Sequence, residues 1–389
     1  MIRSLKGLYH LIIAIASIIW FRFPGKSLTV IGVTGTDGKT TTTTLIYEIL
    51  KSAGVKASMI SSVHAVIAGK SYETGFHVTT PNAYWLQKYL RDAVDHGDTH
   101  VVLEVTSHGL DQYRVFGVLF AVGVLTNITH EHLDWHKTFE NYRRTKLKLL
   151  TASKIVILNR DEADSYGGMV DQLRSKTLVS YGIRRDAKIT PHNFPFVTKL
   201  PGGFNRYNCL AAIAAASCLG IQKSVIRKAI REFSGVPGRM EYVLTKPFTV
   251  IIDFAHTPNA IKNVLKFVRE QTKRRLIHVF GSAGLRDHSK RPLMGNASSE
   301  YADIIVLTEE DYRTEDVNGI IDEIASGIDK KKEVYRYPNR GDAIAFALSL
   351  AKSADTVIIT GKGHEKSLCR ATTEYPWSDQ EEVKKYGKH

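Results

Sequence analysis

Short runs of apolar residues alternate along the chain with longer stretches whose apolar positions have helical spacing. These runs lie at residues 28–33, 100–105, 120–126, 155–159, 249–253, 275–280, 303–308 and 356–360. They are rich in valine and isoleucine and have the length of buried strands. Because strands that alternate with helices are typical of parallel sheets, the pattern predicts an α/β fold with largely parallel sheets.

The length of the chain predicts more than one domain. Its 389 residues exceed the size of a single typical hydrophobic core, so two domains are expected and a third is allowed. The best hinge candidate is the segment 235–239, Gly-Val-Pro-Gly-Arg, after which a new group of apolar runs begins. We predict an N-terminal helix at residues 1–26, a central domain at 27–237 and a C-terminal domain at 238–389.

The segment at residues 11–21 is apolar on all sides. Basic residues flank it on both sides, namely Arg3, Lys6, Arg22 and Lys26. As a helix it is ~16 Å long, about half of a ~30 Å hydrocarbon core, so it should not span a membrane. No convincing signal-peptide cleavage site follows, and we expect a cytoplasmic protein. Two interpretations remain, a helix packed on the protein or a helix lying on the inner face of the cytoplasmic membrane through Trp20.

Charge and cysteine content narrow the possible partners. The net charge of +14, from 53 Lys and Arg against 39 Asp and Glu, suits an anionic substrate, a membrane surface or nucleic acid. No RNA- or DNA-binding signature accompanies this charge, so we expect no nucleic-acid partner. Cys209, Cys218 and Cys369 are widely spaced in apolar surroundings, which indicates reduced packing residues rather than disulfides or a zinc site.

The strongest candidate site follows the first apolar run. The segment 35–41, Gly-Thr-Asp-Gly-Lys-Thr-Thr, separates this run from a helical pattern over residues 40–51. A strand, a glycine-rich turn and a helix N-terminus form a phosphate cradle, because glycine lets backbone N–H groups approach the anion and the helix dipole favours negative charge. Lys39 can reach the β- and γ-phosphates, and the Thr40 hydroxyl can hold Mg²⁺. Val33 stands where the general motif has its first glycine.

Candidate metal ligands follow the next runs. Glu104 lies at the carboxyl end of the run at 100–105, where a Mg²⁺ ligand beside the phosphate loop is expected. Residues 129–136, Thr-His-Glu-His-Leu-Asp-Trp-His, suggest metal or phosphate binding, although their spacing is not a zinc pattern. Helical spacing at residues 142–150 places Lys146 on a helix.

Ordered motifs along the chain resemble those of the Mur ligases. They are Gly35-Thr-Asp-Gly-Lys-Thr-Thr, Glu104-Val-Thr-Ser-His-Gly-Leu-Asp-Gln-Tyr-Arg114, Thr126-Asn-Ile-Thr-His-Glu-His-Leu-Asp134, Tyr142-Arg-Arg-Thr-Lys146, Gly203-Phe-Asn-Arg-Tyr-Asn208, Gly238-Arg-Met-Glu241, Asp253-Phe-Ala-His-Thr-Pro258, Lys290-Arg-Pro-Leu-Met-Gly295 and Gly361-Lys-Gly-His-Glu365. Within that family the resemblance is strongest to the MurE type, which adds the third residue of the stem peptide to a UDP-N-acetylmuramoyl-dipeptide. It covers roughly residue 11 to the C-terminus. Asp37 stands where the family loop more usually has asparagine.

The resemblance implies an ATP-dependent, ADP-forming amide-bond ligase of peptidoglycan precursor synthesis, with a central P-loop-type ATPase domain and a C-terminal Rossmann-like domain. A substrate carboxylate attacks the γ-phosphate of ATP, and an amine then displaces phosphate from the acyl phosphate. Lys39, Glu104, His132 and Lys146 take catalytic roles by this resemblance. Thr40 and Glu104 hold one Mg²⁺, and His132 holds a second. Lys146 matches a carbamylated lysine, whose carbamate offers the metal oxygen ligands that an ammonium group lacks.

The resemblance also assigns the binding residues. Those for ATP are Gly35, Thr36, Asp37, Gly38, Lys39, Thr40, Thr41, Asn205, Asn208, Arg239, Asp253 and His256, of which Asn205 and Asn208 match an adenine-binding pair. Those for the muramoyl-peptide acceptor are Thr79, Thr80, Thr106, Gln112 and Arg114. Those for the incoming amino acid are Arg286, Asp311, Arg313, Gly361 and Glu365.

The selectivity loop departs from the family pattern. Relatives that use meso-diaminopimelate have Asp-Asn-Pro-Arg where this chain has Glu310-Asp-Tyr-Arg313. The retained arginine can pair with a second carboxylate, whereas the added carboxylate of Asp311 can favour a side-chain amine. We expect a diamino acid, with diaminopimelate ahead of lysine or ornithine.

A UDP-binding domain precedes the phosphate loop in the family, and here only what looks like its last helix is expected. The acceptor is therefore either UDP-linked or lipid-linked. Two alternatives remain: another Mur-like ligase, of the MurT type or a poly-γ-glutamate or cyanophycin synthetase type, and a regulatory protein that binds nucleotide without catalysis. The apparent completeness of the metal set argues against the second.

Overall fold

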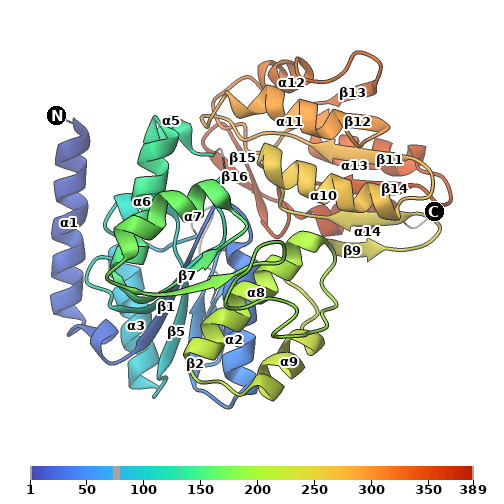
Figure 1. The fold of residues 1–389 in the computed structure, drawn as a ribbon. Coiled ribbons are helices and arrows are strands. Elements are labelled where there is room, and N and C mark those ends of the chain that lie inside the picture. Colours follow the sequence, from blue (N-terminus) through green and yellow to red (C-terminus); the bar gives the residue numbers. More distant parts are fainter. Residues whose placement is uncertain (1, 73–78, 130, 388–389) are drawn as a thin grey trace. The chain divides into compact units, whose positions relative to one another are not determined.

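The computed structural model describes residues 2–72, 79–129 and 131–387 (Figure 1). Its contacts form two compact units, here called the first unit (residues 1–129 and 138–234) and the second unit (residues 130–137 and 235–389). The main boundary between the units lies between Ser234 and Gly235. Gly235 is the first residue of the predicted hinge segment 235–239.

The first unit is built on an eight-stranded sheet with the order β4-β3-β2-β5-β1-β6-β7-β8. Its strands are β1 (Thr29–Thr34), β2 (Ala57–Ile60), β3 (Ala65–Ile67), β4 (Lys70–Tyr72), β5 (His100–Glu104), β6 (Phe120–Leu125), β7 (Ser153–Asn159) and β8 (Thr177–Tyr181). Its helices are α1 (Ile2–Trp20), η1 (Pro24–Lys26), α2 (Lys39–Ser52), α3 (Ala83–Asp95), α4 (Ser107–Asp111), α6 (Phe139–Thr151), α7 (Ala163–Val170), η2 (Asp171–Leu173), α8 (Gly203–Cys218) and α9 (Lys223–Glu232). The pairings along β2-β5-β1-β6-β7-β8 are parallel, whereas β3 pairs antiparallel with both β2 and β4.

Helices cover this sheet because its central strands are apolar on both faces. Strands β1, β5 and β6 are almost completely buried, and α3 and α6 share one apolar cluster with them. The helices α2 and α8 pack against the strands and against each other, and α9 packs on both of them (Figure 1). The arrangement confirms the predicted α/β fold with a mostly parallel sheet.

The register of the central strands brings three loops to one edge. Val33 of β1 pairs with Glu104 of β5, and Thr34 pairs with Leu125 of β6. These three strands are parallel neighbours, so their carboxyl ends meet and the loops that follow them lie together. Ligands of open α/β sheets bind at this edge.

The N-terminal helix α1 spans Ile2–Trp20, within the predicted segment 1–26. It extends beyond the apolar run at residues 11–21, because the mixed sequence before that run also supports a helix. Ala14, Ser17 and Ile18 form its buried stripe, and the helix packs on α3. Among the described residues, no helix is both long and apolar enough to cross a membrane.

The second unit contains a six-stranded sheet with the order β13-β12-β11-β14-β10-β9 and a separate β15-β16 hairpin. Its strands are β9 (Glu241–Leu244), β10 (Thr249–Ile252), β11 (Leu276–Phe280), β12 (Ile304–Thr308), β13 (Glu333–Tyr337), β14 (Thr356–Ile359), β15 (Ser367–Arg370) and β16 (Thr373–Pro376). Its helices are α5 (Leu133–His136), α10 (Pro258–Gln271), α11 (Lys290–Ser299), α12 (Val317–Ala325), α13 (Arg340–Leu350) and α14 (Asp379–Tyr386). All strands of the larger sheet are parallel except β9.

Candidate functional site

The predicted phosphate loop joins β1 to α2 in the first unit. Gly38 is the N-terminal cap of α2 with φ +80°, a left-handed conformation that favours glycine. A Cβ atom at this position would lie 2.3 Å from Oδ1 of Asn208 on α8. The backbone N–H of Asp37 donates to Oδ1 of Asn127 at 2.9 Å, and Lys39 Nζ donates to the carbonyl of Thr36 at 2.7 Å. The loop is therefore bonded to Asn127, which follows β6, and packs closely against α8, at a helix N-terminus of the kind that binds anions.

Oxygen atoms gather where β5 ends beside this loop. Thr40 Oγ1 donates to Oε1 of Glu104 at 3.2 Å, and both residues are buried. Ser62, which follows β2, donates to Glu104 through its Oγ at 2.9 Å and through its backbone N–H at 2.9 Å. A buried carboxylate with two hydroxyl groups is an oxygen-only donor set, which fits Mg²⁺. The sequence predicted Thr40 and Glu104 for this place and missed Ser62.

Lys146 lies at the same edge, on α6. Its side chain is 1% exposed, its Nζ donates to the carbonyl of Gly35 at 2.7 Å, and it lies 4.5 Å from the ring centre of Tyr142. The Tyr142 hydroxyl is 3.1 Å from Oγ1 of Thr36, so the loop, the tyrosine and the lysine are in contact. A lysine this deeply buried is uncommon, and here its contacts are the Gly35 carbonyl and the Tyr142 ring.

The histidine and acidic side chains predicted to bind metal do not gather in one place in the described residues. Over the described part of the chain, no group of three or more His, Cys, Asp and Glu residues could hold an ion. His132 belongs to the short segment that groups with the second unit, has φ +58° and lies 3.9 Å from a carboxylate oxygen of Glu131. Glu131 in turn pairs with Lys290 at 3.1 Å.

The two asparagines predicted for adenine lie together on α8. Asn208 Nδ2 donates to Oδ1 of Asn205 at 2.8 Å, and Asn205 Nδ2 donates to the carbonyl of Pro201 at 2.6 Å. Asn208 also accepts a long bond, 3.5 Å, from Oγ1 of Thr42 on α2. The structure therefore brings the asparagine pair next to the phosphate loop within the first unit.

The remaining predicted nucleotide residues lie in the second unit. The Arg239 guanidinium stacks over the ring of Phe254 at 4.1 Å. Asp253, at the end of β10, accepts from the backbone N–H groups of Met240 and Ala255, each at 2.7 Å. His256 Nδ1 is 2.9 Å from the carbonyl of Phe254. These residues form one local group at the carboxyl end of β10.

The residues predicted for the acceptor form a connected network in the first unit. Thr80 Oγ1 donates to the carbonyl of Glu104 at 3.1 Å and accepts from the Thr106 N–H at 3.0 Å. Arg114 donates to the Thr80 carbonyl at 2.5 Å and grips Oε1 of Gln112 with two nitrogens, at 2.9 and 2.6 Å. Burial lowers the pKa of Arg114 from its ordinary value. Thr79 joins the network through Ser62 Oγ, at 3.1 Å.

The residues predicted for the amino acid come from three loops of the second unit. Arg286 follows β11 and is exposed, whereas Arg313 follows β12 with φ +54° and donates from Nη1 to the carbonyl of Gly284 at 2.8 Å. Gly361 follows β14, and a Cβ atom there would lie 2.8 Å from Oε2 of Glu310. Burial and the nearby charge of Asp311 raise the pKa of Glu310 to about 7.

Lys362 is a member of this group that sequence reasoning missed. It is fully buried, and its Nζ lies 2.8 Å from Oδ1 of Asp311 and 2.5 Å from Oε2 of Glu365. The backbone N–H of Cys369 also donates to Asp311, at 2.9 Å. The charge of Asp311 is therefore compensated within the unit. In the sequence, a lysine between Gly361 and Gly363 is expected at the surface. Its burial depends on its ion pairs with Asp311 and Glu365, and Asp311 comes from a distant part of the chain.

Comparison with known proteins gives consistent results. Two family models match, the Mur ligase middle domain over residues 33–216 and the Mur ligase, glutamate ligase domain over residues 238–363. The chain is 41% identical over 383 residues to UDP-N-acetylmuramoyl-L-alanyl-D-glutamate--2,6-diaminopimelate ligase of Aquifex aeolicus, a match that covers 94% of this chain and 78% of that protein.

Solved structures of the same ligase type and of more distant enzymes share the fold. A structure of UDP-N-acetylmuramoyl-L-alanyl-D-glutamate--2,6-diaminopimelate ligase has 30% identity and a TM-score of 0.61, and the match covers 92% of this chain and 78% of that one. Folylpolyglutamate synthase of Mycobacterium tuberculosis has 17% identity and a TM-score of 0.72, covering 90% and 91%. The second likeness concerns the fold alone.

Proposed function

Because the chain belongs to the Mur ligase family and is a MurE-like, ATP-dependent amide ligase, we propose that it adds 2,6-diaminopimelate to a muramoyl-dipeptide acceptor in peptidoglycan precursor synthesis. The position of Glu104 carries this proposal. Its carboxylate contacts Thr40 of the phosphate loop, and its carbonyl accepts from Thr80 of the acceptor network. The end of one buried strand thus joins the nucleotide side of the site to the acceptor side.

The reaction proceeds through an acyl phosphate. The acceptor carboxylate attacks the γ-phosphorus of ATP, the bond to the β–γ bridging oxygen breaks, and ADP leaves. The amine of the amino acid then attacks the acyl carbon, loses a proton, and expels inorganic phosphate as the amide forms. The phosphate-loop N–H groups and Lys39 bind the polyphosphate, and Arg114 with Thr80 orients the acceptor.

We assign the metal ligands from the donor set in the structure and from the family. Mg²⁺ supplies charge neutralisation at the transferred phosphoryl group. Thr40, Glu104 and the newly found Ser62 suit one ion by their oxygen atoms. A carbamylated Lys146 is a proposed Mg²⁺ ligand, since a carbamate there would replace a cation by an oxygen donor. His132 is proposed as a ligand of a second ion on the family resemblance alone.

Compensation of Asp311 by Lys362 supports diaminopimelate over lysine. A neutralised carboxylate offers little to a side-chain amine, whereas Arg313 offers a cation to a distal carboxylate. The test of the function is phosphate release by the purified chain over a panel of amino acids, with UDP-linked and lipid-linked muramoyl-dipeptide as acceptors. Release that requires both diaminopimelate and acceptor supports the proposal. Release with no amino-acid dependence contradicts it.

The Arg313→Ala variant is expected to lose selectivity for the distal group of the amino acid. We expect kcat/KM for diaminopimelate to fall by a factor equivalent to ~1.5–3 kcal/mol, the value of a charged hydrogen bond, and kcat/KM for lysine to change little. Arg336→Ala is the control, because this exposed arginine lies on β13 of the same sheet and pairs with Asp322. Equal losses for both amino acids would show that Arg313 does not bind the distal carboxylate.

We also propose that α1 lies on the anionic surface of the cytoplasmic membrane. Leu8, Ile12, Ile19 and Trp20 are 54–77% exposed on this helix. Large apolar side chains gathered on an exposed face are typical of an interaction or membrane site. Lys6, Arg22 and Lys26 lie at the ends of the same segment, and each basic residue near an anionic leaflet contributes about 1 kcal/mol. At this surface a lipid-linked muramoyl peptide would reach the site by lateral diffusion.

The Ile12→Glu, Ile19→Glu double variant is expected to abolish flotation of the full chain with anionic liposomes. The two carboxylates remove apolar surface that would be buried in the membrane interface, and their negative charge repels the anionic lipid headgroups. Val197→Glu is the matched control, because Val197 is 70% exposed and lies away from α1, in the segment between β8 and α8. If neither the original chain nor the control binds liposomes, and UDP-linked acceptor outcompetes lipid-linked acceptor, the membrane proposal is wrong.

A further inference from the structure

Two neighbouring loops of the second unit carry the arginines assigned to the amino acid. The first loop, residues 281–289, follows β11 and contains Arg286, and the second, residues 309–316, follows β12 and contains Arg313. Strands β11 and β12 are parallel partners, with Phe280 opposite Leu307, so both loops leave the same edge of the sheet. The distance between the two arginines therefore depends on what holds these loops together.

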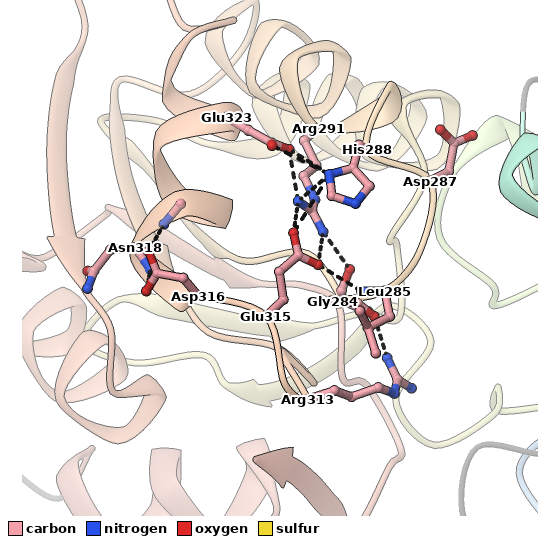
Figure 2. Close-up of polar contacts among 12 residues, drawn as sticks. Gly284, Leu285, Asp287, His288, Arg291, Arg313, Glu315, Asp316, Asn318 and Glu323 are labelled. Atoms are coloured by element: carbon pink, nitrogen blue, oxygen red, sulfur yellow. Dashed lines mark hydrogen bonds and ion pairs between the residues drawn. The ribbon is translucent and has the colours of Figure 1, made fainter. Parts of the chain in front are cut away.

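A buried arginine lies behind both loops. Arg291, in the first turn of α11, is 0% exposed and forms a fork with Glu315, Nη1 to Oε1 at 2.6 Å and Nη2 to Oε2 at 2.9 Å. Its Nη1 also donates to Glu323 of α12 at 2.8 Å and to Nδ1 of His288 at 3.1 Å. Figure 2 shows the guanidinium between the two carboxylates. Such paired charge-assisted bonds fix geometry as well as charge.

Glu315 connects the arginine to the first loop. Its Oε2 accepts from the backbone N–H of Leu285, at 2.8 Å (Figure 2). Leu285 directly precedes Arg286 in the chain. Arg291 Nη2 reaches the same loop through the carbonyl of Ala283, at 3.3 Å. Hydrogen bonding by Arg291 lowers the pKa of Glu315 to about 2, so this carboxylate is charged throughout the physiological range.

The two loops are also in direct contact next to the bond between Leu285 and Glu315. The Gly284 N–H donates to the carbonyl of Asp311 at 2.8 Å, and a Cβ atom at Gly284 would lie 2.0 Å from the carbonyl of Tyr312. Leu285 and Arg313 both have left-handed backbones, with φ +56° and +54°. Such conformations cost about 1 kcal/mol or more in a non-glycine residue, so they persist only where neighbouring bonds enforce them. The Leu285 bond to Glu315 is one of these.

We propose that Glu315, held by Arg291, is a positioning residue that sets the spacing between the Arg286 loop and the Arg313 loop and thereby selects an amino acid with two carboxylates. This inference rests on the proposed function and deepens it. Neither Glu315 nor Arg291 needs to touch the substrate. The ion pair acts through the Leu285 N–H on one loop and through the chain connection to Arg313 on the other.

Glu315→Gln and Glu323→Gln form a matched pair of variants. Both remove one carboxylate charge from the same guanidinium, but only Glu315 also bonds Leu285. We expect Glu315→Gln to raise KM for diaminopimelate about 10- to 100-fold, since small displacements of positioning groups have effects of this size, and to lower the preference for diaminopimelate over lysine. The KM for ATP should stay unchanged. Glu323→Gln should leave all three quantities near their original values.

Hydrogen exchange gives a second readout that does not require activity. Glu315→Gln should accelerate amide exchange in residues 284–286 and 311–313, and Glu323→Gln should not. Arg291→Lys keeps a cation but cannot form the two parallel bonds to Glu315, so it should give the same exchange pattern as Glu315→Gln. If Glu315→Gln does not fold, Arg291→Lys serves as the test variant. Equal effects of the two glutamine variants on KM, or faster exchange with unchanged selectivity, would overturn the proposal. If the original chain releases no phosphate with any amino acid, the proposed function is wrong. The role of Glu315 in amino-acid selection is then wrong as well, even if hydrogen exchange shows that Glu315 holds the two loops together.

Discussion

The Lys146→Arg variant is expected to lose ligase activity by on the order of 10³-fold or more while it still binds ATP. Arginine keeps a cation in the buried position and can still donate to the Gly35 carbonyl, the bond that Lys146 makes at 2.7 Å. It cannot form the carbamate that we propose as a metal ligand. Phosphate release with acceptor and diaminopimelate measures the loss, and calorimetric titration with ATP measures the retained binding.

Lys148→Arg is the control for this variant. Lys148 lies two residues away on α6, its side chain is 50% exposed, and its Nζ is 3.7 Å from Asp111. This change should leave turnover intact. The original protein, equilibrated with ¹³C-labelled carbon dioxide, should also give a carbamate carbon signal that Lys146→Arg lacks. Near-normal turnover by Lys146→Arg would remove the proposed role of the lysine.

The Glu104→Gln variant is expected to lower kcat/KM by about 10²- to 10³-fold, because it removes the one charged oxygen ligand from the site beside Thr40 and Ser62. Glutamine has nearly the same shape and can still accept from the Ser62 N–H, which now bonds the carboxylate at 2.9 Å. The fold should therefore persist. When phosphate release is titrated with Mg²⁺, the concentration that gives half-maximal activity should rise, in addition to the fall in the maximal rate.

Glu48→Gln on α2 is the corresponding control, since this glutamate is partly exposed and pairs only loosely with Lys51, at 3.8 Å. It should leave the Mg²⁺ titration unchanged. A Glu104→Gln enzyme with the original Mg²⁺ dependence would show that the carboxylate does not bind the metal.

Each of the eight predicted apolar runs matches a strand to within two residues at either end, namely β1, β5, β6, β7, β10, β11, β12 and β14. Strands such as β1 and β11 are covered on both faces, so they appear in the sequence as continuous apolar runs. The runs left out several short or partly covered strands, among them β2, β3 and β8, and also β4 and β13, whose side chains are largely exposed or half-buried at the sheet edges. Edge strands lack the burial that creates the pattern, and only the neighbouring strand defines them.

The same reasoning explains which site residues could be predicted. Thr40 and Glu104 stand next to recognisable elements, a glycine-rich turn and the end of an apolar run, and the structure places their side chains in contact. Ser62 follows the short strand β2, and only the register of β2 against β5 brings it to Glu104. Arg291 and Lys362 are basic residues that are fully buried, which is uncommon. Nothing in the neighbouring sequence indicates that either side chain is buried.

The order of the strands β5-β1-β6 has a consequence for how the protein reaches its active form. Thr40 meets Glu104 across 64 residues of chain, and Lys146 meets Gly35 across 111. Neither contact can form within a local hairpin, because parallel strands need long crossover connections. Loop-closure entropy must be overcome before these contacts contribute any stability, which slows folding. During synthesis the phosphate loop emerges from the ribosome before Glu104, and a nascent chain that ends before Glu104 lacks the carboxylate of the proposed Mg²⁺ site.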